Sequence, residues 1–388
     1  MKYRFENFGG IIASEDPPFL AYVDRDFMRG IGLEESPSWK EGNEEVGLLS
    51  APTEVHLAAT NRCPLGCEHC YMSSDRPEPG EMDTETFKGA LRALADMGVF
   101  HVALGGGEAL TRPDLFELAH YARSLGIVPN LTVSGAIMSA EIAERMNVFG
   151  QVNVSLDGVG ALYGVHRGVA GFEKASRAID LLRAASVATG INCVVGRNNF
   201  DGIPQLFDLA AEKGVNEIEF LRYKPAGRGA ASYLTHRTTY EQNVRLVPLL
   251  MEQSERTGVV AKIDCSFMPM LAIHGPPPEV LQRMATYGCE AGNVLLGIRS
   301  DGMVSGCSFL SSEGLGISSL SKEWLSDPHL VKMRTFVEKA PEPCRSCDYL
   351  SICKGGCHAV ALHLVGDPHA PDPDCPRVVR YQRGEVSA

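Results

Sequence analysis

The sequence predicts an α/β protein: a partial (β/α)6 TIM-like barrel followed by a cysteine-rich C-terminal domain. Two observations support this fold class. Between residues 55 and 223, short apolar runs alternate with amphipathic stretches, which is typical of parallel strands covered by helices. Seven of the twelve cysteines then fall between Cys289 and Cys375 at close spacings. With 388 residues, the chain is long enough for two or three such units.

The barrel elements follow one another in a regular order. Strands are expected at 55–60, 100–104, 129–133, 151–156, 191–195 and 216–223, with helices at 84–97, 114–125, 139–146, 171–186 and 204–213. Gly98, Gly126, Gly190 and Gly214 are each expected just after a helix, because glycine readily adopts the left-handed conformation of a helix end. The strands contain apolar runs without alternation, so we expect both of their faces to be buried.

Composition and charge exclude several classes of protein. The net charge is −12, which does not match the basic surface of a general nucleic-acid binder. No apolar run approaches the roughly 18 residues of a membrane span, and the N-terminus has no apolar signal-peptide segment. We therefore expect a cytoplasmic protein without nucleic-acid or membrane partners. Thiols stay reduced in the cytoplasm, so patterned cysteines there indicate metal binding or catalysis.

The first cysteine group, Cys63, Cys67 and Cys70, directly follows the first strand as C-x3-C-x2-C. We refer to these three residues as the loop cysteines. Three thiolates can hold three irons of a [4Fe–4S] cluster and leave the fourth iron open. Zinc would require a fourth ligand, and the neighbouring His69 is sterically awkward for that role.

Polar and glycine-rich residues follow most of the other strands. They are GGGEAL (105–110), SGA (134–136), DGVGALYGVHRG (157–168) and PAGRG (225–229). Each segment alone could be a turn or a helix cap. The C-terminal ends of parallel barrel strands meet at one mouth, so together the segments favour an active site there.

These loops resemble the signature of the radical S-adenosylmethionine (radical SAM) superfamily. The resemblance implies that SAM chelates the open iron, and that cluster reduction cleaves SAM to a 5′-deoxyadenosyl radical. It also implies a set of SAM contacts. His69 would pack near the adenine, while the other contacts would come from Gly106, Gly107, Glu108, Ser134, Ser155, Asp157 and Arg167. For Ser155 and Arg167, a structural cap or an ion pair remains the alternative.

The C-terminal cysteines resemble the SPASM domain of peptide- and protein-modifying radical SAM enzymes. The resemblance implies two auxiliary clusters, and hence three [4Fe–4S] clusters in all; two zinc ions are the alternative. One auxiliary cluster would be held by Cys344, Cys347, Cys353 and Cys375, and the other by Cys289, Cys307 and Cys357.

Two departures from the SPASM pattern matter. Many relatives carry a further cysteine between Cys289 and Cys307, which this chain lacks. The fourth iron of that cluster is expected to be open, for a substrate atom to bind; ligation by Cys265 is the alternative, while Cys193 is expected in the barrel core. Ser308 stands where sulfatase-maturing relatives carry an aspartate, which argues against formylglycine formation because the general base is missing.

The first fifty residues are expected to form two short strands around a turn and a short helix near 24–31. They resemble the opening of the leader-peptide-binding domain of peptide maturases. Since that domain is incomplete, we expect a separate small leader-peptide-binding protein to dock here; a simple cover for the barrel is the alternative. The opening also resembles maturases of Nif11-type precursors, including spliceases, which excise tyramine from an X-Tyr-Gly site and leave an α-keto-β-amino acid.

The expected organisation has four parts: a docking segment at 1–50, the barrel at 51–235, a linker helix and bridging region at 236–288, and the SPASM domain at 289–388. Arg222, Lys224 and Arg228 are expected to form a basic rim for a peptide, unless they pair with Glu219 or SAM.

The expected function is radical modification of a ribosomal precursor peptide, in the manner of a splicease, with an external electron donor. The alternatives are carbon–carbon or thioether crosslinking or oxidative decarboxylation, as in mycofactocin- or sactipeptide-type maturases. A non-catalytic iron–sulfur electron carrier is the alternative of another class.

Overall fold

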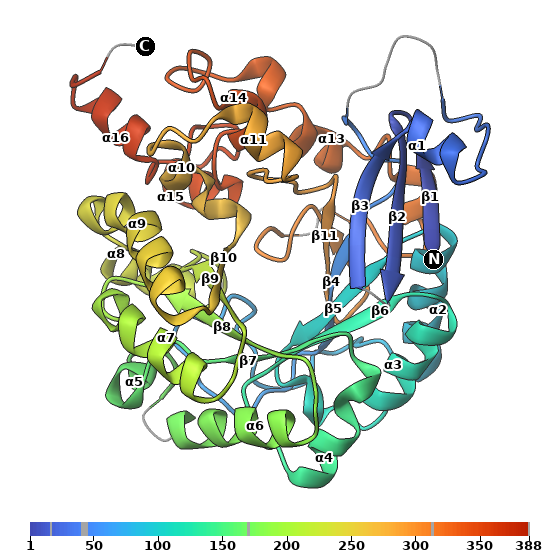
Figure 1. The fold of residues 1–388 in the computed structure, drawn as a ribbon, viewed down its shortest axis with the longest axis vertical. Helices are drawn as coiled ribbons and strands as arrows, with labels where there is room; N and C mark the ends of the chain where they lie inside the picture. Colours follow the sequence, from blue (N-terminus) through green and yellow to red (C-terminus); the bar gives the residue numbers. More distant parts are fainter. Residues whose placement is uncertain (16–17, 40–45, 169–170, 312–313, 387–388) are drawn as a thin grey trace.

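A computed structural model describes residues 1–15, 18–39, 46–168, 171–311 and 314–386 of the chain. A small N-terminal sheet, a large sheet wrapped by helices and a C-terminal helical region make up the molecule (Figure 1). Among these residues no helix is both long and apolar enough to span a membrane.

The large sheet contains every predicted barrel strand and extends beyond them at both edges. The strand order is β10-β9-β8-β7-β6-β5-β4-β11-β12. All neighbours are parallel except β11 and β12. The bounds are β4 (Glu54–Thr60), β5 (His101–Gly106), β6 (Val128–Val133), β7 (Val152–Ser155), β8 (Thr189–Val195), β9 (Glu217–Arg222), β10 (Val260–Ile263), β11 (Leu295–Ile298) and β12 (Val304–Ser305). The added strands satisfy backbone groups that a six-stranded sheet would leave unpaired at its edges.

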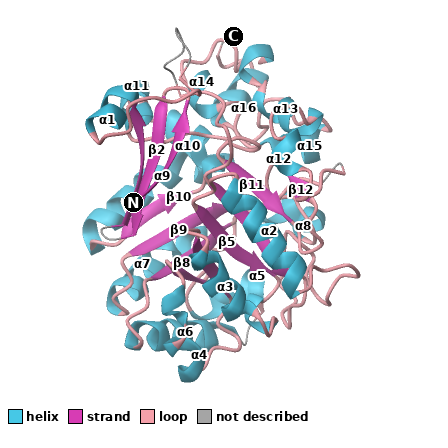
Figure 2. Ribbon diagram, turned by 90° about the vertical axis from the view of Figure 1, so that its right-hand side faces the viewer, coloured by secondary structure: helices cyan, strands magenta, loops and turns pink. Residues whose placement is uncertain are grey.

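Helices cover the outer face of this sheet (Figures 1 and 2). They pack on it through leucine, isoleucine, valine, phenylalanine and alanine side chains in one continuous core. Asp83 caps α2, and Thr239 with Gln242 forms a capping box at α9. The covering helices are α2 (Thr84–Asp96), α3 (Leu115–Ser124), α4 (Ala140–Glu144), α6 (Phe172–Ala184), α7 (Ile203–Glu212) and α9 (Tyr240–Thr257).

One predicted helix end is wrong. Gly98, Gly126 and Gly214 have positive φ angles after helices, as expected, but Gly190 lies inside β8. Ser186 takes the left-handed position after α6 instead, with φ of 57°. A Cβ on Gly190 would lie 2.4 Å from the side-chain oxygen of Asn153, so a larger residue there would displace that side chain.

The inner face of the barrel is polar, contrary to the expected burial of both strand faces. Strands β5, β6 and β9 alternate between buried and half-buried residues. On the inner side, the Asn153 amide donates to the Asn192 side-chain oxygen at 2.7 Å, and Asn192 reaches Thr132. Apolar residues of these strands supply the outer core, and the polar residues between them face the barrel interior.

The N-terminal sheet has three antiparallel strands rather than the two expected: β1 (Lys2–Glu6), β2 (Gly9–Glu15) and β3 (Pro18–Asp24). The predicted helix follows as α1 (Arg25–Gly30), capped by Asp24. Arg4 donates to the backbone carbonyls of Ala51 and Pro52, and Phe8 and Ile11 pack with Phe100 beside β5. This sheet therefore covers part of the barrel, while β3 forms one of its edges.

Short helices and loops form the cysteine-rich end of the chain. They enclose buried Trp324, Leu330, Phe336 and Val360. The remaining helices are α5 (Gly164–Arg167), α8 (Gly229–His236), α10 (Met268–Ala272), α11 (Pro278–Arg283), α12 (Leu320–Glu323), α13 (Pro328–Arg334), α14 (Leu350–Cys353), α15 (His358–Val365) and α16 (Pro376–Gln382).

Candidate active site

The loop cysteines lie just beyond the C-terminal end of β4, and all three are free thiols. Burial raises the pKa of Cys63 and of Cys67, and the neighbouring thiols raise both further. Binding of iron to the thiolates would offset this cost. Within the described ranges, no three metal-binding side chains converge as tightly as a single ion requires.

The PAGRG segment after β9 forms hydrogen bonds to the loop that carries these cysteines. Arg228 donates from its backbone to the Cys70 carbonyl at 2.9 Å, and from its guanidinium to the carbonyls of Cys67 at 3.0 Å and Ser74 at 2.9 Å. A Cβ on Gly227 would lie 2.4 Å from the Tyr71 carbonyl oxygen. Arg228 thus holds the cluster loop, and its expected place on a basic peptide rim is wrong.

The GGGE segment after β5 packs against the start of the same loop. A Cβ on Gly106 would lie 2.5 Å from the Thr60 carbonyl oxygen, and one on Gly107 would lie 2.2 Å from that of Arg62. Only glycine permits this approach. Glu108 follows and is buried. It accepts hydrogen bonds from the backbone N–H, at 2.9 Å, and the hydroxyl of Ser134, and burial raises its pKa.

The buried carboxylate of Asp157 contacts both Arg167 and His69. Burial alone would raise its pKa, but Arg167 and His69 hold the pKa below its usual value. Its carboxylate lies 2.5 Å from Arg167 Nε and 3.4 Å from His69 Nε2, and it accepts from the Val194 backbone at 2.7 Å. Burial lowers the pKa of His69 to about 4, so this imidazole is neutral at pH 7. Ser155, at the end of β7, is buried two residues away.

Sequence reasoning missed His166. It is buried, and neither ring nitrogen has a hydrogen-bond partner among the described residues. Its ring centroid lies 5.6 Å from that of His69, 5.4 Å from Tyr223 and 5.1 Å from His236. The one available signal was its position directly before Arg167 in the HRG segment.

The seven C-terminal cysteines separate into two sets in space. Burial raises the pKa of Cys307 to about 12, with Cys289 and Cys357 as thiol neighbours. Burial also raises the pKa of Cys344 and of Cys375 to about 12. The thiols that act on Cys353 are those of Cys344, Cys347 and Cys375. The ligand sets that the SPASM resemblance implies stay a prediction.

Cys265 lies beside the first of these sets. It begins the short helical turn Cys265–Phe267 after β10, and its thiol interacts electrostatically with Cys289, Cys357 and Lys224. Lys224 lies 3.8 Å from the Cys357 sulfur and 3.1 Å from the Asp264 carboxylate. Cys193, by contrast, is buried in the barrel core as expected.

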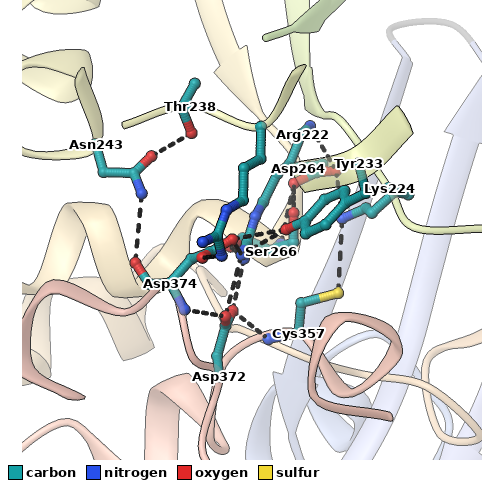
Figure 3. A network of polar contacts seen from close by, with 11 residues as sticks. Arg222, Lys224, Tyr233, Thr238, Asn243, Asp264, Ser266, Cys357, Asp372 and Asp374 are labelled. Atoms are coloured by element: carbon teal, nitrogen blue, oxygen red, sulfur yellow. Dashed lines mark hydrogen bonds and ion pairs between the residues drawn. The ribbon is translucent and has the colours of Figure 1, made fainter. Parts of the chain in front are cut away.

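A buried ion-pair network joins the barrel to the cysteine-rich region (Figure 3). The Arg222 guanidinium lies 2.5 Å and 3.0 Å from the two oxygens of Asp372, and 2.8 Å from Asp374. Asp372 also accepts the backbone N–H of Cys357 at 2.9 Å. Arg222 and Lys224 are therefore buried with carboxylate partners, and the expected basic rim is absent from these positions.

Phe309 lies between the two cysteine regions. Its ring centroid is 5.0 Å from that of Tyr71, which follows Cys70, and 5.1 Å from the amine of Lys224. Phe309 therefore contacts the residue that follows Cys70 and the lysine that lies beside Cys357.

Comparisons with known proteins agree with this geometry. Residues 57–210 match the model of the radical SAM superfamily. The mycofactocin maturase MftC of Mycobacterium tuberculosis is 31% identical over 339 residues, which cover 84% of this chain and 83% of the relative. The PqqA peptide cyclase of Ruegeria pomeroyi is 29% identical over 346 residues, 85% of this chain and 88% of the relative.

Solved structures share the fold. Streptococcus suis SuiB, bound to its precursor peptide SuiA, superimposes with a TM-score of 0.75 at 18% identity, over 96% of this chain and 98% of that one. The structure titled native anSMEcpe with bound AdoMet has a TM-score of 0.67 at 20% identity, over 85% of this chain and 98% of that one. Given the loop cysteines, the strand-end motifs and the 31% identity to a full-length relative, the chain belongs to the radical SAM superfamily, as an enzyme of the SPASM-type group.

Proposed function

We propose that this enzyme modifies a ribosomally synthesised precursor peptide through a carbon radical. The observation that carries the proposal is the position of Phe309, in contact with both Tyr71 and Lys224. A substrate at this point would lie between the loop cysteines and the second cysteine region. An electron carrier has no use for the SAM-type motifs that follow the barrel strands. The relatives named as mycofactocin maturase and PqqA peptide cyclase support a peptide substrate.

Members of this superfamily use SAM and a [4Fe–4S] cluster, which when bound supply the 5′-deoxyadenosyl radical. In the proposal the loop cysteines hold that cluster, and the glycines before Glu108 leave room for the methionyl group. Arg167, held in place by its ion pair with Asp157, would bind SAM, and neutral His69 would lie beside the adenine. The remaining contacts come from Gly106, Gly107, Glu108, Ser134 and Ser155.

We further propose two auxiliary clusters on the two C-terminal cysteine sets. The position of Cys265 beside Cys289 and Cys357 favours Cys265 as the fourth ligand over the open iron expected from the sequence. The lysine at 3.8 Å from the Cys357 sulfur would offset negative charge at that cluster.

Two candidates exist for the exact transformation of the peptide. Splicease chemistry, the excision of tyramine from an X-Tyr-Gly site, rests on the resemblance of the N-terminal segment to Nif11-type maturases. Crosslinking or oxidative decarboxylation of the mycofactocin type is favoured by the 31% identity to mycofactocin maturases. Either reaction takes place on a peptide, and the polar side chains of Asn153, Asn192 and Thr132 offer hydrogen bonds to it.

Anaerobic co-expression with the precursor peptide, followed by high-resolution mass spectrometry, separates the candidates. A splicease product is shorter by one tyramine equivalent and carries a ketone that reacts with hydrazine reagents. Crosslinking removes only hydrogens. The control is the variant with alanine at all three loop cysteines. If the parent enzyme forms no 5′-deoxyadenosine after reduction with SAM present, the radical proposal fails.

The proposed domain arrangement keeps the N-terminal sheet as the docking segment for a separate small leader-binding protein. The outer edge of β3 supports this, since an exposed strand edge can pair with another chain. We also propose that an external protein or reductant donates the electron and that the enzyme is located in the cytoplasm.

A further inference from the structure

A hydroxyl, an imidazole and a carboxylate form a chain inside the barrel. The Ser308 hydroxyl lies 3.3 Å from His56 Nδ1, and His56 Nε2 lies 3.3 Å from the Glu54 carboxylate. Glu54 and His56 alternate along β4 with Val55 and Leu57, which are buried in the core. The alternation therefore turns both polar side chains toward the barrel interior.

A glycine on the neighbouring strand allows Ser308 to reach this position. Gly297 of β11 pairs directly with His56 of β4. A Cβ on Gly297 would lie 2.6 Å from the Ser308 nitrogen and 2.7 Å from the Cys307 carbonyl carbon. Any side chain at 297 would therefore push the Cys307–Ser308 segment away from the imidazole.

The chain is open to the interior rather than packed as a structural contact. The side chains of His56 and Glu54 are 39% and 41% exposed. Ser308 directly precedes Phe309, which contacts Tyr71 on one side and Lys224 on the other. Ser308 therefore lies one residue from the side chain beside which the proposed function places the substrate.

The charges around the imidazole suit proton transfer. The His56 and Glu54 side chains are accessible only from the enclosed barrel interior, where surrounding protein desolvates them. This desolvation lowers the pKa of His56, but the Glu54 hydrogen bond and the charges of Glu54 and Glu219 raise it above its ordinary value. The same desolvation raises the pKa of Glu54, and His56, His101 and Lys262 bring it below its ordinary value. The carboxylate is thus ionised and stabilises the imidazolium that forms when neutral His56 accepts a proton, as in other hydroxyl–imidazole–carboxylate arrangements.

We propose that Ser308, His56 and Glu54 form a proton relay that serves the peptide substrate. This inference rests on the proposed function. As an X–H bond of the peptide breaks, its electron pair stays on the peptide and its proton passes to Ser308 Oγ, while the hydroxyl proton passes to His56 Nδ1. The imidazolium keeps its Nε2 proton, which faces the Glu54 carboxylate. No oxidation or reduction takes place in this step.

The test compares four single variants in the intact enzyme with reconstituted clusters: Ser308→Ala, Ser308→Thr, His56→Gln and the control His101→Gln. His101 is a second half-buried imidazole near Glu54, but it is outside the relay. The readouts are modified peptide, 5′-deoxyadenosine, peptide KM and iron per chain. Ser308→Ala and His56→Gln should each lower the ratio of modified peptide to 5′-deoxyadenosine by about 100-fold, the usual scale of acid–base assistance.

Iron content, peptide KM and 5′-deoxyadenosine formation should stay close to the parent in all four variants. Ser308→Thr, which keeps the hydroxyl, and His101→Gln should keep the parental ratio. Parental coupling in either Ser308→Ala or His56→Gln would overturn the relay, as would an equal loss in His101→Gln. The parent, measured in the same assay, tests the proposed function separately, because its failure to modify the peptide would not depend on Ser308.

Discussion

The substitution Arg222→Met should destabilise the contact between the barrel and the cysteine-rich region. Only 3% of the Arg222 side chain is exposed, against 0% for Asp372 and 9% for Asp374. Methionine fills similar space but leaves two buried carboxylates without their shared cation. Breaking a buried pair in this one-sided way costs about 3–5 kcal/mol. The lower end is expected, because Asp374 keeps hydrogen bonds from Tyr233 and Arg237.

The assay is anaerobic urea unfolding of the reconstituted enzyme, followed by far-ultraviolet circular dichroism, with iron release as a second signal. Arg237→Met is the matched control. That arginine also pairs with Asp374 but is 33% exposed, so its loss should cost no more than about 1 kcal/mol. If Arg222→Met retained parental stability and iron content, the buried network would not hold the two regions together.

The same network predicts a pH dependence. Burial raises the pKa of Asp372, but Arg222 holds it below the ordinary value. A depressed carboxyl pKa stabilises the fold above the unfolded value, near 4, and this stabilisation is lost as the pH falls through the folded value. In Arg222→Met the same burial, without the arginine, should leave the Asp372 pKa above its ordinary value. The stability difference between the parent and Arg222→Met should therefore shrink as the pH falls from that raised pKa toward the depressed pKa of the parent. A constant difference down to pH 3 would contradict this reasoning.

Three further outcomes are expected. Alanine at all three loop cysteines should remove one cluster, four of about twelve irons per chain, and all SAM cleavage; surviving cleavage would refute the radical assignment. Cys265→Ser should change the electron paramagnetic resonance spectrum of one auxiliary cluster while Cys193→Ser does not, and identical spectra would favour the open iron. Phe19→Glu, on exposed β3, should weaken peptide modification but not uncoupled SAM cleavage, whereas Phe27→Glu on α1 should do neither. Equal effects of the two would argue against docking at β3.

Local sequence was sufficient for most of the barrel. Apolar runs and helix caps act over a few residues, so all six strands and their helices were predicted within a few positions. The exceptions have tertiary causes. Gly190 was assigned to a helix end, but it lies inside β8, where it packs against the Asn153 side chain. Strands β10 and β11 join the sheet at its edges, which a local pattern cannot predict because their partners are remote in sequence.

Cysteine spacing and the strand-end motifs were enough to predict the radical SAM family and its SPASM-type group, since a cluster loop requires its ligands at fixed short separations. Which polar groups face one another was decided only by tertiary structure. The sequence predicted a basic peptide rim from Arg222, Lys224 and Arg228. In the structure, Arg222 and Lys224 form ion pairs with carboxylates, and Arg228 donates hydrogen bonds to backbone carbonyls. Ser308 meets His56 across 252 positions of the chain. The partner of a buried charged side chain is set by which elements pack beside it, and that packing depends on the whole fold.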